Sequence, residues 1–282
     1  MQISIGITAY NEEKNISKLL DRLLKEKFSF ILREIIVVAS GCTDRTKDIV
    51  KEFTKINKKI ILIVEKKRRG KASAINIIFK KAESDIMVFI DADDIPTKNS
   101  INKLIEPFKK NDVFTTTGRM VPKIDGSRLI DFLNYFIWEL HHQVSINQPK
   151  ISGQFFAIKR HLIRKVYEKA ICDDAFIEGI LRKNNIKTVY VPEATIYIET
   201  PTTISNFWKQ RRRIAAGYIQ LKLMNLNAAY SLSQIMKALM KKIIKKPNSL
   251  HKIIFAIFLE IFTNIFAFYD ILRKNIQYCW ER

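Results

Sequence analysis

Short runs of apolar, largely β-branched residues alternate with helix-like segments over the first 95 residues, and this alternation limits the fold more than any other feature of the chain. The strand-like runs cover residues 3–8, 34–39, 60–64 and 86–90. Helical periodicity covers residues 12–27, 44–56 and 70–82 between them. Short strands that are apolar on both faces and separated by helices predict a parallel sheet covered on both sides. The expected fold class is therefore α/β.

After residue 97 the pattern is less regular. We expect a helix and then a strand within 98–121, a helix at 129–143, a strand at 151–158, a helix at 176–184, a strand at 188–191 and a basic helix at 205–226. The remainder is expected to be helical and increasingly apolar. With 282 residues and no low-complexity linker, the chain can form one large domain or one domain with an appendage.

The net charge of +21 is large and unevenly distributed. From Ser205 onward, 14 lysines and arginines face only 3 acids, so about half of the excess lies in the last quarter. Such a field attracts polyanions, which include nucleic acid, anionic lipid and phosphorylated substrates.

Neither the cysteines nor the N-terminus indicates an exported protein. Cys42, Cys172 and Cys279 are scattered and fit neither a disulfide framework nor a zinc site. Met1 leads directly into the first apolar run, without the features of a signal peptide. We expect a reducing compartment, with the catalytic part in the cytoplasm.

Polar side chains follow each of the first four expected strands. These segments are residues 8–13, 40–44, 68–71 and 91–94. Because ligands of parallel α/β sheets bind beyond the carboxyl ends of the strands, we expect these segments to converge on one binding site.

Asp91 and Asp93 are two residues apart, so in extended backbone their carboxylates point to the same side. Two carboxylates, together with water and diphosphate oxygens, form the oxygen-rich shell that Mg²⁺ or Mn²⁺ prefers. A structural alternative is that Asp93 or Asp94 caps a helix that follows Pro96.

Four motifs in this order resemble those of the family 2 glycosyltransferases. They are residues 7–13 (ITAYNEE), 40–46 (SGCTDRT), 70–76 (GKASAIN) and 91–94 (DADD). The resemblance runs from residue 3 to about residue 217. It implies an inverting enzyme with a GT-A fold, which is a Rossmann-like, mostly parallel sheet flanked by helices. It also implies a catalytic domain at 1–217, divided into a nucleotide-binding half (1–97) and an acceptor half (98–217), before a helical region at 218–282.

The resemblance places the nucleotide sugar at the first strand ends and on the metal-binding Asp91. The matching positions for its base and ribose are Thr8, Ala9, Tyr10 and Glu12. Ser40 lies where many relatives carry an aspartate that contacts the base, and Asp44 could instead cap its own helix. Lys71, at a helix start, suits a diphosphate.

Residues 172–176 (CDDAF) resemble the acidic acceptor-side motif of the family. The second acid of that motif is the catalytic base, which implies that Asp174 takes the proton from the acceptor hydroxyl. Asp173 is then expected to orient Asp174 or to contact the acceptor. The alternative is an exposed, acidic helix start. Gly153 matches a small-residue strand beside the acceptor pocket, although a plain core strand also fits.

Residues 199–203 and 208–217 resemble the E-x-P-T segment and the Q-x-x-R-W helix of membrane-associated members. Gln210 matches the glutamine, with a role at the acceptor, and Arg213 matches the arginine, with a role at the donor diphosphate. Ile214 replaces the tryptophan, which weakens any inference of polymer synthesis. The alternative for residues 211–213 is a basic face that lies on anionic lipid.

Residues 253–272 form a twenty-residue apolar segment, about as long as a bilayer core is thick. Because a charge such as Glu260 costs roughly 2.5 kcal/mol or more at the centre of a span, we prefer an amphipathic helix or hairpin in the membrane interface. A single span is the second choice, and a buried helix or a dimer contact is the soluble alternative.

The sequence therefore predicts an enzyme that uses Mn²⁺ or Mg²⁺ and transfers a sugar from a nucleotide-diphosphate sugar, preferably a UDP-sugar. We expect a lipid-linked or glycan acceptor and an anionic membrane surface on the cytoplasmic face. We expect no nucleic-acid partner. The alternatives are a nucleotidyltransferase-like enzyme, which should carry a glycine-rich basic loop after its first strand, and a basic nucleic-acid-binding protein. The second alternative leaves the acidic pairs unexplained.

Overall fold

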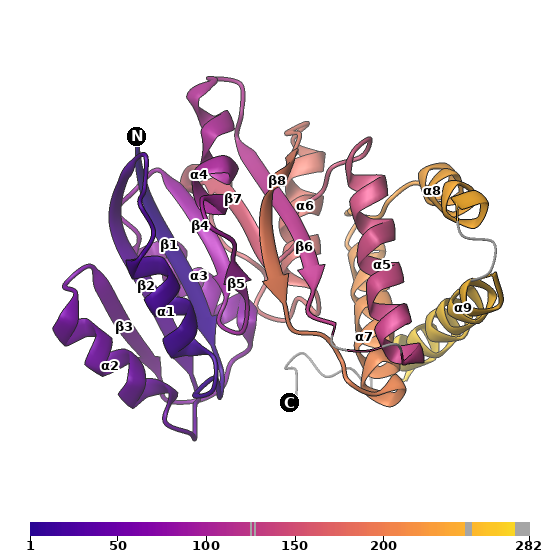
Figure 1. The fold of residues 1–282 in the computed structure, drawn as a ribbon, viewed down its shortest axis with the longest axis horizontal. Helices are drawn as coiled ribbons and strands as arrows, with labels where there is room; N and C mark the ends of the chain where they lie inside the picture. The colour runs from indigo at the N-terminus through magenta and orange to yellow at the C-terminus, as the bar shows by residue number, and fades with distance from the viewer. Residues whose placement is uncertain (125, 127, 246–249, 274–282) are drawn as a thin grey trace.

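The computed structural model describes residues 1–124, 126, 128–245 and 250–273. Its first half is the expected alternation of strands and helices (Figure 1). The elements are β1 (Gln2–Ala9), α1 (Ile16–Leu24), β2 (Ile31–Ser40), α2 (Thr46–Ile56), β3 (Ile60–Glu65), α3 (Lys71–Lys81) and β4 (Ile86–Asp91). The four strands pair in parallel in the order β3-β2-β1-β4. The prediction of a parallel sheet over the first four strands is confirmed.

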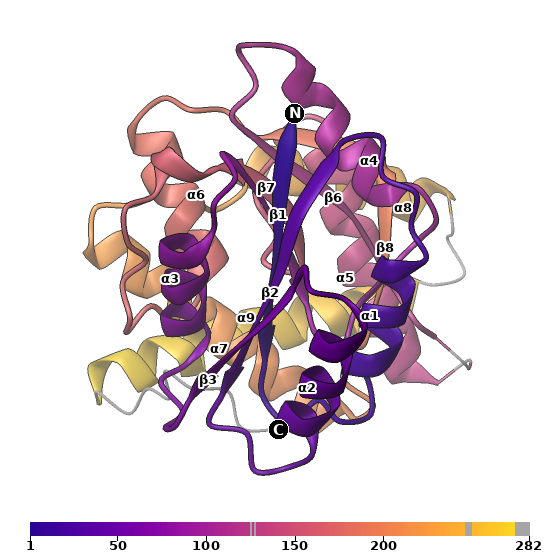
Figure 2. The ribbon, with the colours of Figure 1, turned by 90° about the vertical axis from the view of Figure 1, so that its left-hand side faces the viewer.

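Helices cover both faces of this parallel sheet because both faces are apolar. On one face, α1 buries Ile16, Leu19, Leu20 and Leu23 against the strands. On the other face, α3 buries Ile75, Ile78 and Phe79. Figure 2 shows α1 and α2 on one side of the strands and α3 on the other.

The second half extends the sheet with strands of mixed direction. The elements are β5 (Ile95–Pro96), α4 (Ser100–Ile105), η1 (Glu106–Lys109), β6 (Thr115–Pro122), α5 (Leu129–Ser145), β7 (Phe155–Lys159), η2 (Arg160–Leu162), α6 (Asp173–Lys183) and β8 (Val189–Ile198). The order continues as β4-β7-β6-β8-β5, in which β7 is antiparallel to β4 and β6.

Two strands differ from the prediction for local reasons. The strand expected at 151–158 begins only at Phe155, because Ile151, Ser152 and Gly153 donate their backbone N–H groups to side chains instead of to a neighbouring strand. The strand expected at 188–191 continues to Ile198, and its pairing with β6 shifts register between Gly118 and Arg119. The short β5 was not predicted.

Three helices follow the sheet: α7 (Ile204–Leu223), α8 (Leu232–Lys245) and α9 (Leu250–Leu272). They lie with α5 on the far side of the molecule from β3 (Figure 1). A separate apolar cluster joins α5 to α8 and α9 through Leu133, Phe136, Leu239, Ile253 and Ala256. Cys279 lies outside the described residues.

Two ion pairs attach α9 to α7. Arg211 donates to both carboxylate oxygens of Glu260, at 2.6 and 3.0 Å, and Arg212 forms a two-point pair with Asp270. The interpretation of residues 211–213 as a basic face on lipid is therefore wrong for Arg211 and Arg212, because their charges are neutralised within the protein. Among the described helices, α9 is the one long and apolar enough to cross a bilayer.

Candidate active site

One cavity of about 1100 Å³ contains every residue that the sequence nominated for a site. It opens at the carboxyl ends of β1, β2 and β4 and extends toward α5, α7 and α9. The nominated residues in its wall are Thr8, Ala9, Tyr10, Glu12, Ser40, Lys71, Asp91, Asp93, Gly153, Asp173, Asp174, Gln210 and Arg213. Thr8 and Arg213, which are 205 positions apart in the sequence, thus share one pocket.

The wall beside β1 and β2 presents an aromatic ring and a free hydroxyl. Arg68 lies over the Tyr10 ring, 3.6 Å from its centroid. Gly41 has a φ of 64°, and a side chain there would collide with the Arg68 backbone, so this glycine permits the close approach. The buried Ser40 hydroxyl has no hydrogen-bond partner among the described residues. The sequence placed residues 68–71 among the segments that converge on the site but indicated no individual role for Arg68.

The Asp44 carboxylate links the loop after β1 to the loop after β2. Its carboxylate accepts from the backbone N–H of Thr46 at 3.0 Å, at the start of α2, and from that of Glu13 at 3.0 Å. Thr46 in turn accepts from the backbone N–H of Glu12 at 2.7 Å. The structure therefore supports the helix-start alternative for Asp44.

Lys71 lies at the centre of the site, between the two acidic motifs. Its ammonium is 2.7 Å from Asp91, 3.9 Å from Asp173 and 3.1 Å from the carbonyl oxygen of Gly153. Burial lowers the pKa of Lys71, but the neighbouring Asp91 and Asp173 outweigh that effect and hold the pKa above its ordinary value. Lys71 is therefore a cation that joins the donor acids to the acceptor acids.

Three carboxylates crowd the turn after β4. Oxygen atoms of Asp91, Asp93 and Asp94 lie within 4.8 Å of one another. Burial and the charge of Asp91 raise the pKa of Asp93 to about 6, and burial with both neighbouring acids raises that of Asp94 well above its ordinary value. Because α4 begins after Asn99, neither Asp93 nor Asp94 caps it, and the capping alternative is wrong.

This crowded set of hard oxygen donors fits a divalent cation. Like charges held this close raise one another's pKa, and a bound cation would relieve the repulsion. Only Asp91 belongs to β4, whereas Asp93 lies in the turn that follows. The turn, rather than an extended strand, therefore brings the two carboxylates together.

Asp173 and Asp174 begin α6 and face the same pocket. Asp173 is only 7% exposed, so the interpretation of an exposed acidic helix start is wrong for it. Burial, above all, raises its pKa despite the opposing charge of Lys71. Asp174 accepts from the backbone N–H of Gly153 at 3.1 Å.

Gly153 permits close packing within the site. A Cβ at this position would lie 3.1 Å from Asp174 and 3.4 Å from the Lys71 ammonium. The residue lies in the turn before β7 and not in the predicted strand. Because Gly153 has no side chain, Asp174 and the Lys71 ammonium can approach its backbone closely.

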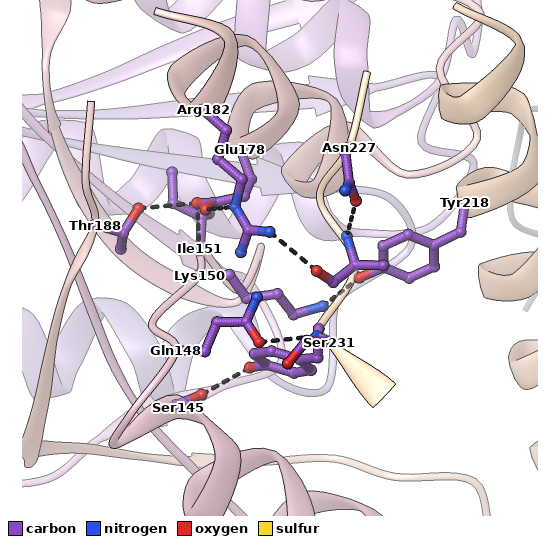
Figure 3. Close-up of polar contacts among 12 residues, drawn as sticks. Ser145, Gln148, Lys150, Ile151, Glu178, Arg182, Thr188, Tyr218, Asn227 and Ser231 are labelled. Carbon is purple, nitrogen blue, oxygen red and sulfur yellow. Dashed lines mark hydrogen bonds and ion pairs between the residues drawn. The ribbon is translucent and has the colours of Figure 1, made fainter. Parts of the chain in front are cut away.

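The acceptor side of the cavity is formed by α7 and the segment before β7. Arg213 donates to the carbonyl oxygen of Ile171 at 2.7 Å, two residues before Asp173. Buried Glu178 of α6 accepts from the backbone of Ile151 and from Thr188 and Arg182, which fixes the segment that carries Lys150 (Figure 3). Sequence reasoning missed Lys150 and Tyr218, which also line the cavity, because no motif marks them.

Comparisons with known proteins agree with this fold. Residues 4–171 match the model of the family described as Glycosyl transferase family 2. "Probable glycosyltransferase YdaM" of Bacillus subtilis is 28% identical over 97% of this chain and 65% of its own length. "Poly-beta-1,6-N-acetyl-D-glucosamine synthase" of Staphylococcus epidermidis is 28% identical over 76% of this chain and 54% of its own length. The chain thus spans between half and two thirds of these relatives.

Solved structures share the GT-A architecture. The mannosyltransferase PcManGT from Pyrobaculum calidifontis, in complex with GDP-Man and Mn²⁺, superposes with a TM-score of 0.61 and 21% identity, covering 90% of this chain and 73% of the other. S. aureus TarS in complex with UDP superposes with a TM-score of 0.55 and 16% identity, covering 100% and 94%. Since the family match covers more than half of its length, this chain belongs to glycosyl transferase family 2.

Proposed function

We propose that this protein is an inverting, metal-dependent glycosyltransferase that moves a sugar from a nucleotide-diphosphate sugar to a lipid-linked or glycan acceptor at a membrane surface. The observation that supports this most is the meeting of two acidic motifs around Lys71. Asp91 and Asp173 are both ion-pair neighbours of that ammonium, although 82 residues separate them in the sequence. The catalytic domain comprises residues 1–217, and residues 218–282 form the membrane-facing region.

The donor lies against the β1 and β2 side of the cavity. The Ser40 hydroxyl and the Tyr10 side chain face a base and ribose, for which Thr8, Ala9 and Glu12 complete the wall. Lys71 and Arg213 supply positive charge toward the diphosphate. A UDP-sugar is our first candidate and a GDP-sugar is tested beside it, since UDP accompanies one structural neighbour and GDP-Man another.

Asp91 and Asp93 would hold Mn²⁺ or Mg²⁺, which when bound supplies positive charge to the leaving nucleoside diphosphate. Asp174 takes the proton from the acceptor hydroxyl as the oxygen forms its bond to the anomeric carbon and the bond to the diphosphate breaks. Attack from the side opposite the leaving group inverts the configuration. Asp173 and Gln210 orient the acceptor.

Thermal unfolding tests the donor class and the metal together. A ligand at a hundred times its dissociation constant stabilises the folded state by about 2.7 kcal/mol, which for this size raises Tm by about 5–10 °C. We expect one nucleotide class among UDP-, GDP-, CDP- and dTDP-sugars to do so, and only with Mn²⁺ or Mg²⁺ present. Asp93→Asn is the matched variant, and it should abolish the metal-dependent part. Stabilisation by no nucleotide, or by all of them without metal, would contradict the proposal.

The membrane part of the proposal rests on α9. Its two acidic residues form ion pairs with α7. The apolar side chains of Ile254, Phe258 and Ile261 on its surface are 56%, 58% and 53% exposed. A helix with this arrangement lies in the interface, on the cytoplasmic face, with the basic segment before it on anionic lipid. The full-length protein should co-sediment with vesicles that contain anionic lipid. Phe258→Ser with Ile261→Ser should weaken this binding, and unchanged binding would remove the role of α9.

A further inference from the structure

The cavity continues beyond the acidic site into an apolar chamber between three helices. Its wall comes from α5, α8 and α9, and the side chains that define it here are Leu140, Val144, Ile235, Leu239, Ala256 and Ile261. The same cavity is lined by Asp174, so the chamber and the reaction site are continuous. A nucleotide sugar bound at the strand ends leaves this apolar chamber for another ligand.

The chamber reaches the exposed surface of α9. Ile257, Ile261 and Ile265 line the cavity and are also 38%, 53% and 59% exposed. A hydrocarbon chain within the chamber would therefore remain in contact with the apolar face of α9 that meets lipid in the proposed function. A polar ligand gains no hydrophobic free energy by leaving water to bind against this wall.

Lys150 lies where the polar and apolar parts of the cavity meet. Its ammonium donates to the Tyr218 hydroxyl (Figure 3). It also lies 4.8 Å from the Tyr218 ring centroid and 4.4 Å from that of Tyr230. Tyr230 shares a 2.7 Å hydrogen bond with Ser145, which holds its ring in place. Within the described residues no carboxylate forms an ion pair with Lys150, whereas in the same cavity Lys71 has two such partners and Arg211 has one.

The position of Lys150 suits a group that belongs to the acceptor. The charges of both Lys150 and Asp174 act on the thiol of buried Cys172, which lies directly before the acidic pair. A cation flanked by aromatic rings is partly desolvated, so an anion beside it restores the interactions lost from water. A phosphate ester combines such an anion with a hydrocarbon chain in one molecule, and its charge of about −2 suits a lysine that has no carboxylate partner among the described residues.

We propose that the acceptor is a lipid with a phosphate-bearing headgroup, which binds with its phosphate at Lys150 and its hydrocarbon chain in the chamber between α5, α8 and α9. This inference rests on the proposed function and names the class of its acceptor. It assigns to Lys150 a binding role that no motif indicates. Continuity of the chamber with the exposed face of α9 provides the entry for the chain.

Quenching of Trp138 fluorescence tests the proposal, because Trp138 is part of the cavity wall. In full-length protein with Trp208→Phe and Trp280→Phe, Trp138 is the remaining tryptophan. The probe is 11-bromoundecyl phosphate, whose bromine quenches indole at short range. The comparison ligands are 11-bromoundecanol, ethyl phosphate and inorganic phosphate, the last two as competitors. They separate the contribution of the chain from that of the phosphate.

We expect saturable quenching by bromoundecyl phosphate, with at least tenfold weaker affinity in Lys150→Gln. Lys150→Arg should keep the affinity within about threefold, and Lys209→Gln, which removes the same charge from an exposed position outside the cavity, should leave it unchanged. The alcohol should bind more weakly than the phosphate and be insensitive to Lys150→Gln. Ethyl and inorganic phosphate should compete poorly.

Equal affinity of Lys150→Gln and Lys209→Gln for the probe would overturn the proposal. So would equal binding of alcohol and phosphate, or full competition by inorganic phosphate. Metal-dependent stabilisation by the nucleotide sugar is measured on the same variants. If it persists while the lipid phosphate fails to bind at Lys150, the acceptor inference is wrong and the glycosyltransferase proposal stands.

Discussion

In the donor half, charged side chains at the strand ends pair with one another across the cavity, whereas on the helical acceptor side two arginines of α7 pair with the acids of α9. Lys71 contacts Asp91 and approaches Asp173 inside the cavity. Arg211 and Arg212 of α7 are instead occupied by the acids of α9. The basic run therefore does not act as one unit, because Arg211 and Arg212 hold α9 whereas Arg213 donates to Ile171 beside the acidic pair.

This comparison predicts that an acid on the acceptor side can be removed without loss of the donor site. Asp174→Asn keeps the shape of the side chain but cannot accept a proton, so kcat should fall by roughly 10²–10⁴-fold. The dissociation constant of the nucleotide sugar, measured by thermal shift or calorimetry, should change less than threefold. Asp112→Asn, at an exposed position, is the control. Activity within tenfold of the original would remove Asp174 as the base.

The next largest effect is expected from the cation that joins the two halves. Lys71→Met leaves Asp91 and Asp173 without their neighbouring ammonium, and removal of one partner from a largely buried pair costs about 2–3 kcal/mol after discounting for partial exposure. The side chains of Lys71 and Asp91 are 29% and 23% exposed. Tm should fall by about 5–10 °C.

A divalent cation should restore much of that loss, because it can neutralise the same carboxylates. The rise in Tm on addition of Mn²⁺ should therefore be larger for Lys71→Met than for the original protein. Lys67→Met, from the exposed part of the same basic run, should change neither quantity. If Mn²⁺ stabilised both variants equally, Lys71 and the cation would not be acting on the same acids.

The donor half could be predicted well because its site is created by strand ends. Once β1, β2 and β4 are identified from their apolar runs, the rule for parallel sheets places Thr8, Ser40 and Asp91 at one edge. The parallel pairing of these strands and the convergence of these residues on one cavity followed from local sequence, whereas the order of the strands comes from the structure.

The acceptor side could be predicted only in part, because long-range pairs decide it. Nothing in the local sequence shows that Glu260 pairs with Arg211, 49 residues earlier. Nor does it show that, in the part of the chain that the structure describes, Lys150 forms no ion pair with a carboxylate. The segment before β7 resembled a strand by composition, yet side chains of Glu178, Thr117 and Asp174 take its N–H groups. Such tertiary competition overrides local preference.

The attachment of α9 can be measured by a double-mutant cycle on Arg211 and Glu260. Their side chains are 23% and 27% exposed and share two hydrogen bonds, so we expect a coupling free energy of about 1–2 kcal/mol from denaturant unfolding. The variants are Arg211→Met, Glu260→Gln and both together. The exposed pair Lys55 and Glu52 is the reference and should give less than about 0.5 kcal/mol. Equal coupling at both sites would mean that the Arg211–Glu260 pair holds α9 no more strongly than an exposed surface pair would.

The smallest effect is a pH dependence that belongs to the helical side. His141 lies beside Trp138 and Tyr230, and burial, followed by the charge of Lys150, holds its pKa well below the ordinary value of 6.5. A depressed pKa means that the unfolded chain binds the proton more readily than the folded one. The contribution of His141 to stability is therefore complete above pH 6.5 and declines as the pH falls below it.

Replacement of His141 by Phe keeps a ring between Trp138 and Tyr230 but removes the titrating group. Between pH 7.5 and 5.5 the original protein should lose on the order of 1–3 °C of Tm more than His141→Phe does. The exposed His161, replaced by Phe in the same way, should leave the pH dependence of Tm unchanged. Because Lys150 contributes to the shift, Lys150→Gln should reduce the difference as well. If His141→Phe kept the original pH dependence of Tm, protonation of His141 would not contribute to that dependence, and the residue would act only through its ring.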